Sequence, residues 1–152
     1  MEIAIRPAAA ADRAVVAACI DAAFGPYVAR IGKPPAPMLV DHGDLIRRGQ
    51  VVVAELAGEI GGVLVCEPRP DHLFVEVLAV DPRHHRAGVG RRMMAFAEAE
   101  AERSGLAEVR LYTHEKMLEA RAFYRALGYV ETERRMEAGY TRAYLVRHLG
   151  TR

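Results

Sequence analysis

The chain has 152 residues, a formal net charge of +1 and 51% hydrophobic residues. This length and apolar content predict a single domain over residues 1–152 with a full hydrophobic core. The near-neutral charge argues against a polyanion-binding protein, because phosphate contacts need a large basic excess on one face, so no nucleic-acid partner is expected.

The start of the chain and its two cysteines indicate a cytoplasmic location. MEIAIRPAAA (1–10) lacks a long apolar run behind a basic start, so we expect no secretory signal. No segment approaches the length of a membrane span, and no membrane partner is expected. Cys19 and Cys66 are far apart and lack a CxxC spacing. This pattern predicts buried thiols in a reducing compartment, with a disulfide as the alternative.

The first third of the chain predicts a strand, a helix and an irregular segment. EIAIR (2–6) alternates like a short strand. A helix is expected to begin near Asp12, and its apolar side consists of Val15, Val16, Cys19, Ile20 and Phe24. Glycines and prolines at 25–37 predict a loop or short irregular helices, and a further helix is expected within 38–48.

The rest of the chain predicts strands and helices in alternation. Strands are expected at 50–56 and 60–68, as a hairpin, and then at 72–80, 107–113 and in a final pair. Helices are expected at 89–103 and 117–127, ended by Gly105 and Gly128. The order β, helices, βββ, α, β, α, ββ predicts a mixed α/β domain.

PRHHRAGVGR (82–91) concentrates positive charge around two glycines, between a predicted strand and a predicted helix. The first N–H groups of a helix have no intrahelical partner and carry the positive end of the helix dipole. Gly88 and Gly90 let an anion approach the backbone, and Arg86 and Arg91 add charge at the rim. The stretch therefore predicts a site for a small phosphate-bearing ligand.

Other interpretations of this stretch are weaker. Adjacent His84 and His85 diverge and have no HExxH-type partner, so no metal is expected. A nucleic-acid patch lacks interleaved aromatic residues. The stretch also differs from the Walker loop and from GxGxxG, and GxG alone is often only a tight turn.

Two motifs resemble the GCN5-related N-acetyltransferase (GNAT) superfamily. LAVDPRHHRAGVG (78–90) is similar to its motif A, [Q/R]-x-x-G-x-[G/A] after a strand, and EARAFYRALGYVE (119–131) is similar to its motif B. The resemblance covers residues 72–130 closely. It departs at His85, where the family has Gln or Arg, and at Met117, where many members have Asn.

The resemblance implies the GNAT fold and acetyl-CoA as co-substrate, without a metal. The fold is α/β (α+β), with a mixed, mostly antiparallel sheet of about seven strands, splayed between the fourth and fifth, and about four helices. The implied cofactor contacts are the main chain of Leu78, Ala79 and Val80 and the loop residues His85, Arg86, Ala87, Gly88, Val89, Gly90 and Arg91. The N–H of Leu78 is a candidate donor to the developing oxyanion.

Two residues are candidates for catalysis. Glu76 is the candidate base, directly or through water, because a carboxylate within HLFVEVLAV (72–80) is costly to bury unless it is paired or solvated. The alternative is a charge without a role at the open part of the sheet. Tyr124 matches the motif B tyrosine that protonates the departing thiolate. The alternative is an apolar stripe shared with Met117, Ala120 and Leu127.

These features predict an N-acetyltransferase that moves an acetyl group to a primary amine by direct attack in a ternary complex. The acceptor is a small molecule, an amino acid or a peptide or protein, and Tyr27, Asp41 and His114 are weaker candidates for its contacts. Two alternatives stay open: a non-catalytic acyl-CoA sensor and an aminoacyl-tRNA-directed acetyltransferase. The resemblance also leaves a homodimer open.

Overall fold

The computed structural model describes residues 2–150, which form two compact units. The first unit comprises residues up to Cys66 together with Val77–Ala95, and the second comprises Glu67–Glu76 and the chain from Phe96 onward. The strands are arranged in a seven-stranded sheet of order β1-β2-β3-β4-β5-β7-β6. The pair β4 and β5 is parallel, which is the mixed α/β arrangement predicted for the GNAT fold.

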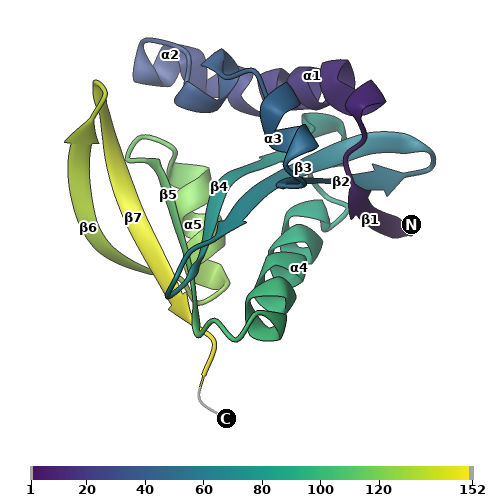
Figure 1. The fold of residues 1–152 in the computed structure, drawn as a ribbon. Helices are drawn as coiled ribbons and strands as arrows, with labels where there is room; N and C mark the ends of the chain where they lie inside the picture. The colour runs from purple at the N-terminus through teal and green to yellow at the C-terminus, as the bar shows by residue number, and fades with distance from the viewer. Residues whose placement is uncertain (1, 151–152) are drawn as a thin grey trace. The chain divides into compact units, whose positions relative to one another are not determined.

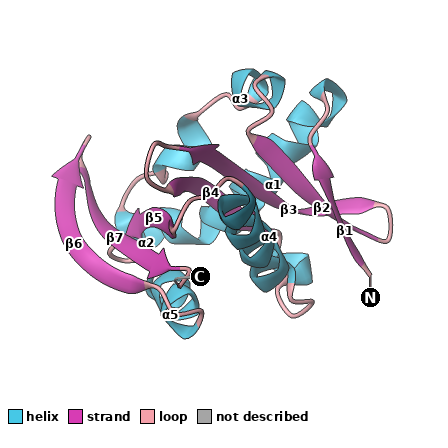
Figure 2. Ribbon diagram, turned by 60° about the horizontal axis from the view of Figure 1, so that its bottom comes forward, coloured by secondary structure: helices cyan, strands magenta, loops and turns pink. Residues whose placement is uncertain are grey.

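The first unit contains the N-terminal strands and helices (Figures 1 and 2). Its complete elements are β1 (Ile3–Pro7), α1 (Arg13–Phe24), α2 (Val28–Ile31), α3 (Gly43–Arg47) and β2 (Val51–Leu56). It also holds most of β3 (Glu59–Pro68), the second half of β4 (Leu73–Val80) and the first half of α4 (Val89–Arg103). Helices α1 and α3 lie on one side of β2 and β3, and α4 lies on the other.

The core of the first unit forms where the apolar side of α1 meets the sheet. Val16, Cys19 and Ile20 are buried, as the sequence predicts, while Val15 is exposed. Burial raises the pKa of the Cys19 thiol to about 11, so the thiol stays protonated at neutral pH. Cys66 is only partly buried, which corrects the prediction of two buried thiols, and neither cysteine forms a disulfide.

Helix α1 ends at Phe24, and short helices follow it without a break, as the sequence predicted for 25–37. Pro26 occupies the first turn of a 3-10 helix (Gly25–Tyr27) that joins α1 to α2, a position where proline interrupts no hydrogen bond. The resulting run, Ala10–Ile31, has 22 residues and contains an 18-residue window with a mean hydropathy of 1.5, enough by length and composition to cross a membrane. The prediction that no segment approaches that length is therefore wrong, although core helices of globular proteins meet the same criterion.

The helix expected within 38–48 is shorter than predicted. A 3-10 helix (Ala36–Leu39) comes first, and α3 begins only at Gly43. Between them the carboxylate of Asp41 accepts the N–H of Gly43 at 2.9 Å, which is a turn contact. His42 is buried beside this turn, and its Nε2 lies 3.2 Å from the carbonyl oxygen of Pro37.

The second unit consists of β5 (Glu108–His114), α5 (Leu118–Ala126), β6 (Val130–Glu137) and β7 (Tyr140–His148), with the first half of β4 and the second half of α4. Strand β7 pairs antiparallel with both β5 and β6. Helix α5 covers one face of β5 and β7, where Thr113 Oγ1 donates to Met117 Sδ at 3.6 Å (Figure 1). The core of this unit lies beneath α5.

The parallel pairing of β4 and β5 is short. It joins Leu73–Val75 to Val109–Leu111, although both strands continue further. In the described part of the chain, no pairing with β5 is recorded for β4 beyond Val75. The backbone of Val77–Val80 therefore has no β5 partner, as expected for a sheet that opens between its fourth and fifth strands.

Candidate functional site

Asp81 fixes the loop that precedes α4. Its carboxylate accepts the backbone N–H of Arg83 at 3.0 Å and the Arg83 guanidinium at 3.2 and 3.0 Å. These bonds hold the pKa of the nearly buried Asp81 carboxyl below its ordinary value. Pro82 occupies the first turn of the 3-10 helix Pro82–His84, and its ring fixes the backbone φ there. The proline ring and the Asp81 bonds together restrict the conformation of this turn.

The N-terminus of α4 presents free backbone donors. The first helical bond of this turn runs from the N–H of Arg92 to the carbonyl of Gly88, at 3.1 Å. Within residues 2–150, the N–H groups of Val89, Gly90 and Arg91 donate to no backbone carbonyl. Gly88 has a φ of +79°, and a Cβ added there would meet nothing within 4 Å. Three adjacent donors at the positive end of a helix, beside open space, form a geometry suited to an anion.

The charged side chains of this loop differ in availability. Arg83 is paired with Asp81 at 3.0 Å and with Glu59 at 3.4 Å, so its charge is already neutralised. Arg86 and Arg91 are exposed and have no ion pair with any described residue. Their guanidinium groups lie next to the helix N-terminus in sequence, and their predicted role at the rim of a ligand stays a prediction.

The remaining loop residues have different environments. His85 is exposed, whereas His84 lies against β3 with Nε2 buried and without a described hydrogen-bond partner. Ala87 is half-buried and its N–H donates to the carbonyl of His84 at 3.1 Å, so that group is not free for a ligand. The side chain of Val89 is in the core, so only its backbone faces a ligand.

Two glycines of β3, which the sequence analysis did not single out, allow this loop to form. A Cβ on Gly61 would lie 2.6 Å from Cδ2 of His84, and a Cβ on Gly62 would lie 2.6 Å from Cγ1 of Val89. The carbonyl of Gly61 also accepts the N–H of Asp81 at 2.9 Å. A GG pair inside a β-branched strand is the signal that could have revealed this close approach.

Strand β4 presents the residues expected to contact the cofactor. Its burial alternates, so that Ala79 is buried and Leu78 and Val80 are half-buried on the other face. Glu76 and Phe74 share that second face by alternation. The predicted grouping of Glu76 with Leu78 and Val80 therefore agrees with the burial pattern.

Glu76 is exposed, so its carboxylate is solvated, which is one of the two conditions under which the sequence allows a charge in this strand. Its carboxylate has no hydrogen bond or ion pair with any described residue. A free carboxylate on an open strand face remains available to a cationic ligand.

Tyr124 lies in the second unit, on α5. Its side chain is only 7% exposed and sits between two aromatic rings, with centroids 5.2 Å from Phe123 and 5.9 Å from Tyr129. Met117 is buried at the N-cap of the same helix. Tyr124 is therefore both part of the predicted apolar stripe and a phenol with a defined ring position.

The face of the second unit opposite α5 is open and aromatic. Phe74, Tyr112 and Tyr144 follow one another across three strands, with centroid distances of 5.9 and 5.6 Å. An arginine lies over each ring: Arg69 over Phe74, Arg142 over Tyr112 and Arg135 over Tyr144. Burial and the charge of Glu76 contribute to raising the pKa of Tyr112.

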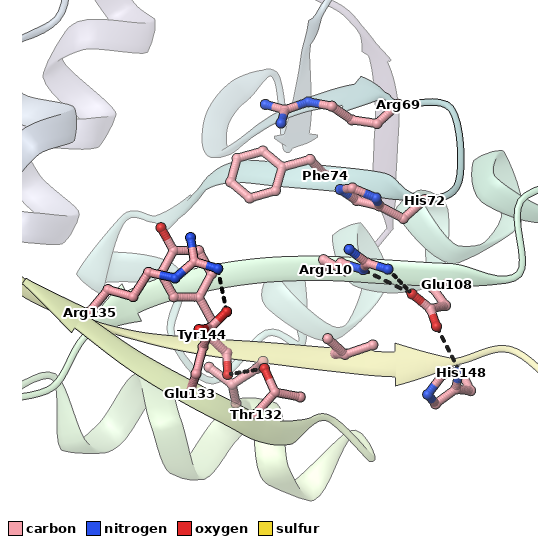
Figure 3. Close-up of a pocket in the computed structure, with 12 residues that line it drawn as sticks. Arg69, His72, Phe74, Glu108, Arg110, Thr132, Glu133, Arg135, Tyr144 and His148 are labelled. Atoms are coloured by element: carbon pink, nitrogen blue, oxygen red, sulfur yellow. Dashed lines mark hydrogen bonds and ion pairs between the residues drawn. The ribbon is translucent and has the colours of Figure 1, made fainter. Parts of the chain in front are cut away.

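A groove of about 440 Å³ continues along this face. Figure 3 shows Phe74 and Tyr144 on opposite sides of it, with Arg69 and Arg135 at the rim. Arg110 and Glu108 form an ion pair of 2.7 Å at one end. The groove has apolar walls, and its rim carries both positively and negatively charged side chains.

The three weaker substrate candidates are already engaged. Arg30 lies over the ring of Tyr27 at 5.2 Å. Asp41 forms an ion pair with Arg13, and its bond from the Gly43 N–H is the main cause that lowers its pKa. His114 Nδ1 accepts the N–H of Lys116 at 3.1 Å. In the described part of the chain, no cluster of three or more His, Cys, Asp or Glu side chains is suited to a metal ion.

Comparison with known sequences places this site in a family. The profile of the acetyltransferase (GNAT) family matches residues 16–129. A curated relative, N-acetyltransferase family 8 member 3 from Rattus norvegicus, is 34% identical over 86 residues, which is 53% of this chain and 38% of the relative. The chain thus spans under half of that relative's length. The chain belongs to the GNAT acetyltransferase family.

Solved structures agree with this fold. PaiA N-acetyltransferase from Thermoplasma acidophilum, solved with coenzyme A, superposes with a TM-score of 0.78 over 95% of this chain and 98% of its own, at 16% identity. The ribosomal-protein-S18-alanine N-acetyltransferase from Escherichia coli gives a TM-score of 0.78 over 99% and 96%, at 17% identity. At these identities the likeness concerns the fold alone.

Proposed function

We propose that the protein transfers the acetyl group of acetyl-CoA to a primary amine by direct attack within a ternary complex. The observation that carries this proposal is the start of α4, where Gly88 leaves open space beside three free backbone N–H groups. This geometry fits a pyrophosphate, because its oxygens accept several N–H bonds without a Cβ in the way. Family membership and a neighbour solved with coenzyme A support the same ligand.

The chain's own groups have separate tasks in binding. The N–H groups of Val89, Gly90 and Arg91 bind the pyrophosphate, and the guanidinium groups of Arg86 and Arg91 add charge-assisted contacts. The backbone of Leu78, Ala79 and Val80, which has no β5 partner, binds the pantetheine arm. The N–H of Leu78 then polarises the acetyl carbonyl.

Proton transfer assigns roles to Glu76 and Tyr124. An alkylammonium has a pKa of about 10.4 in water, so Glu76 accepts a proton from it, directly or through water. The amine nitrogen then bonds to the acetyl carbon and gives its second proton to solvent, and the carbon–sulfur bond breaks. Tyr124 gives its phenolic proton to the departing sulfur, since a phenol is protonated at neutral pH. Proton exchange with solvent restores both residues.

The acceptor approaches the open face of the second unit in this proposal. The carboxylate of Glu76, which is exposed and has no ion pair with a described residue, supports binding of a cationic amine there. Tyr27, Asp41 and His114 remain weaker candidates for acceptor contacts. The absence of a disulfide at Cys19 and Cys66 supports the reducing conditions of the cytoplasm as the place of reaction.

The proposal is tested by measuring CoA release from acetyl-CoA with a panel of small amines, amino acids and peptides. Tyr124→Phe should lower kcat by about 10-fold or more while acetyl-CoA affinity is unchanged. Glu76→Gln should lose activity at neutral pH and recover part of it at high pH, where the amine deprotonates unaided. Acetyl-CoA binding without turnover of any amine would instead indicate a sensor, and a Glu76→Gln pH profile equal to wild type would place the base elsewhere.

A further inference from the structure

Tyr129 contacts Tyr124 in two independent ways. Its backbone N–H donates to the carbonyl of Tyr124 at 3.0 Å, across the left-handed Gly128 that ends α5. Its ring meets the Tyr124 ring edge-on, with centroids 5.9 Å apart and an interplanar angle of 66°. The peptide N–H of Tyr129 therefore contacts the backbone of Tyr124, and the side chain of Tyr129 contacts its ring.

The Tyr129 ring is itself held in place from α4. It is 2% exposed, and its hydroxyl donates to Glu98 Oε2 at 2.9 Å. The other oxygen of Glu98 pairs with Arg147 of β7 at 2.7 Å, so both oxygens of the carboxylate are engaged. Burial and the Glu98 charge raise the pKa of Tyr129, so the phenol remains a donor to Glu98 at neutral and alkaline pH.

The arrangement exceeds what core packing requires. The aromatic residue that follows Leu127 and Gly128 needs no hydroxyl to fill the space beneath α5, because a phenylalanine would bury the same ring. A buried phenol that donates to an ion-paired carboxylate fixes the plane and depth of its ring. Because the Tyr124 ring packs edge-on against this ring, a shift of the Tyr129 ring changes the packing of the Tyr124 ring.

We infer that Tyr129, anchored by Glu98 and Arg147, is a positioning residue for Tyr124. This inference rests on the proposed role of Tyr124 as the proton donor. Misplacing a proton donor by a fraction of an ångström lowers the rate of the chemical step and leaves substrate binding nearly unchanged. The hydroxyl of Tyr129 therefore acts on kcat through Tyr124, without touching either substrate.

A double-mutant cycle on kcat tests the inference. Tyr129→Phe should lower kcat by about 5-fold while the KM for acetyl-CoA is unchanged. In the Tyr124→Phe background the same change should have no further effect, because the group it positions is already absent. Glu98→Gln should lower kcat similarly, whereas the control Glu100→Gln, two residues along α4 in an exposed pair with Arg103, should not.

The outcomes separate the two ideas. If Tyr129→Phe lowers kcat by the same factor in both backgrounds, its role is structural and the inference is wrong, while Tyr124 keeps its role. If Tyr129→Phe leaves kcat unchanged in an enzyme that Tyr124→Phe impairs, the inference is also wrong. If Tyr124→Phe has full turnover, the proposed proton donor is wrong and the inference falls with it. Thermal unfolding of each variant confirms that the assay temperature lies below the transition.

Discussion

At Gly62, the absence of a side chain sets how closely α4 approaches β3. A Cβ there would lie 2.6 Å from Cγ1 of Val89 and 2.8 Å from Sδ of Met93. Met93 can adjust because its side chain is flexible, but Val89 is β-branched and begins the helix that carries the free N–H groups. Gly62 therefore links packing of the strand to geometry of the anion site.

Gly62→Ala should lower stability by about 1–3 kcal/mol, the usual cost of overpacking, and should weaken CoA binding as α4 shifts. The measurement is urea unfolding together with calorimetric titration of CoA. Adding Val89→Ala should restore CoA affinity, since it removes the methyl groups in conflict. If Gly62→Ala binds CoA as tightly as wild type, the position of α4 does not depend on this contact.

Asp81 contributes stability that depends on pH. Its bonds to Arg83 hold the pKa of the folded carboxyl below the ordinary value of 3.8. A lowered pKa in the folded state means that the ionised form is favoured by folding. The contribution is therefore present above the ordinary pKa and is lost as the pH falls through and below it.

Asp81→Asn keeps an oxygen for the Arg83 N–H but removes the titrating charge. We expect the variant to be less stable than wild type by up to about 1 kcal/mol at pH 7, a small value because Arg83 is exposed. The difference should shrink toward zero below pH 3.8, which urea unfolding at pH 7, 5 and 3 measures. A difference that is constant with pH would show that the charge has no part in it.

At the scale of elements, two hairpins use the same turn. Leu56 pairs with Glu59 around Ala57–Gly58, and Glu137 pairs with Tyr140 around Ala138–Gly139. In each turn both central residues have positive φ, 51° and 81° in the first and 50° and 83° in the second. These are type I′ turns, in which Asn-Gly is the preferred pair and alanine is strained.

Ala57→Asn and Ala138→Asn should each stabilise the protein by about 0.5 kcal/mol, because asparagine tolerates the left-handed conformation better than alanine. Thermal unfolding should show a higher unfolding temperature for each single variant, and the two increases should add in the double variant. The same change at exposed Ala14, within α1, should destabilise through lower helix propensity. If all three substitutions lower the unfolding temperature, turn strain is not the deciding factor.

The elements show which structural features a sequence reveals. The helix predicted at 89–103 is α4 residue for residue, because an apolar period of 3.6 is bounded by a glycine at each end. The helix within 38–48 is shorter than predicted because the Asp41 turn delays its start to Gly43. Alternation placed Glu76 on its correct face but could not show that the face is open, since exposure depends on the other elements of the fold.

In the candidate site, too, features that are local in sequence could be predicted, and contacts between distant residues could not. The loop at 82–91 was recognisable because its glycines and arginines are adjacent in sequence. The contributions of Gly61 and Gly62 depend on contacts between residues over twenty positions apart, which local pattern does not encode. The anchoring of Tyr129 by Glu98 and Arg147 likewise joins three elements, so only the structure brings those residues together.

At the scale of the whole molecule, two continuous elements belong to both compact units. Strand β4 gives Leu73–Glu76 to one unit and Val77–Val80 to the other, and α4 is divided after Ala95. Neither unit can unfold without disrupting a strand and a helix of its counterpart. We therefore expect one cooperative unfolding transition, despite the two compact units.

Acetyl-CoA should raise the midpoint temperature of that single unfolding transition. A ligand present at 100 times its dissociation constant stabilises the folded state by about 2.7 kcal/mol, which corresponds to several degrees for a chain of this size. Calorimetric scans with acetyl-CoA, and with ATP and NAD as controls, should show one transition that moves only with the CoA compound.

Gly88→Glu is the matched variant for these scans. It places a carboxylate in the space meant for phosphate, at a φ of +79° that disfavours any side chain, and should abolish the shift. A shift retained by the variant would place the ligand away from the start of α4. Two transitions, of which acetyl-CoA moves only one, would show that the units unfold independently and that the shared strand and helix do not couple them.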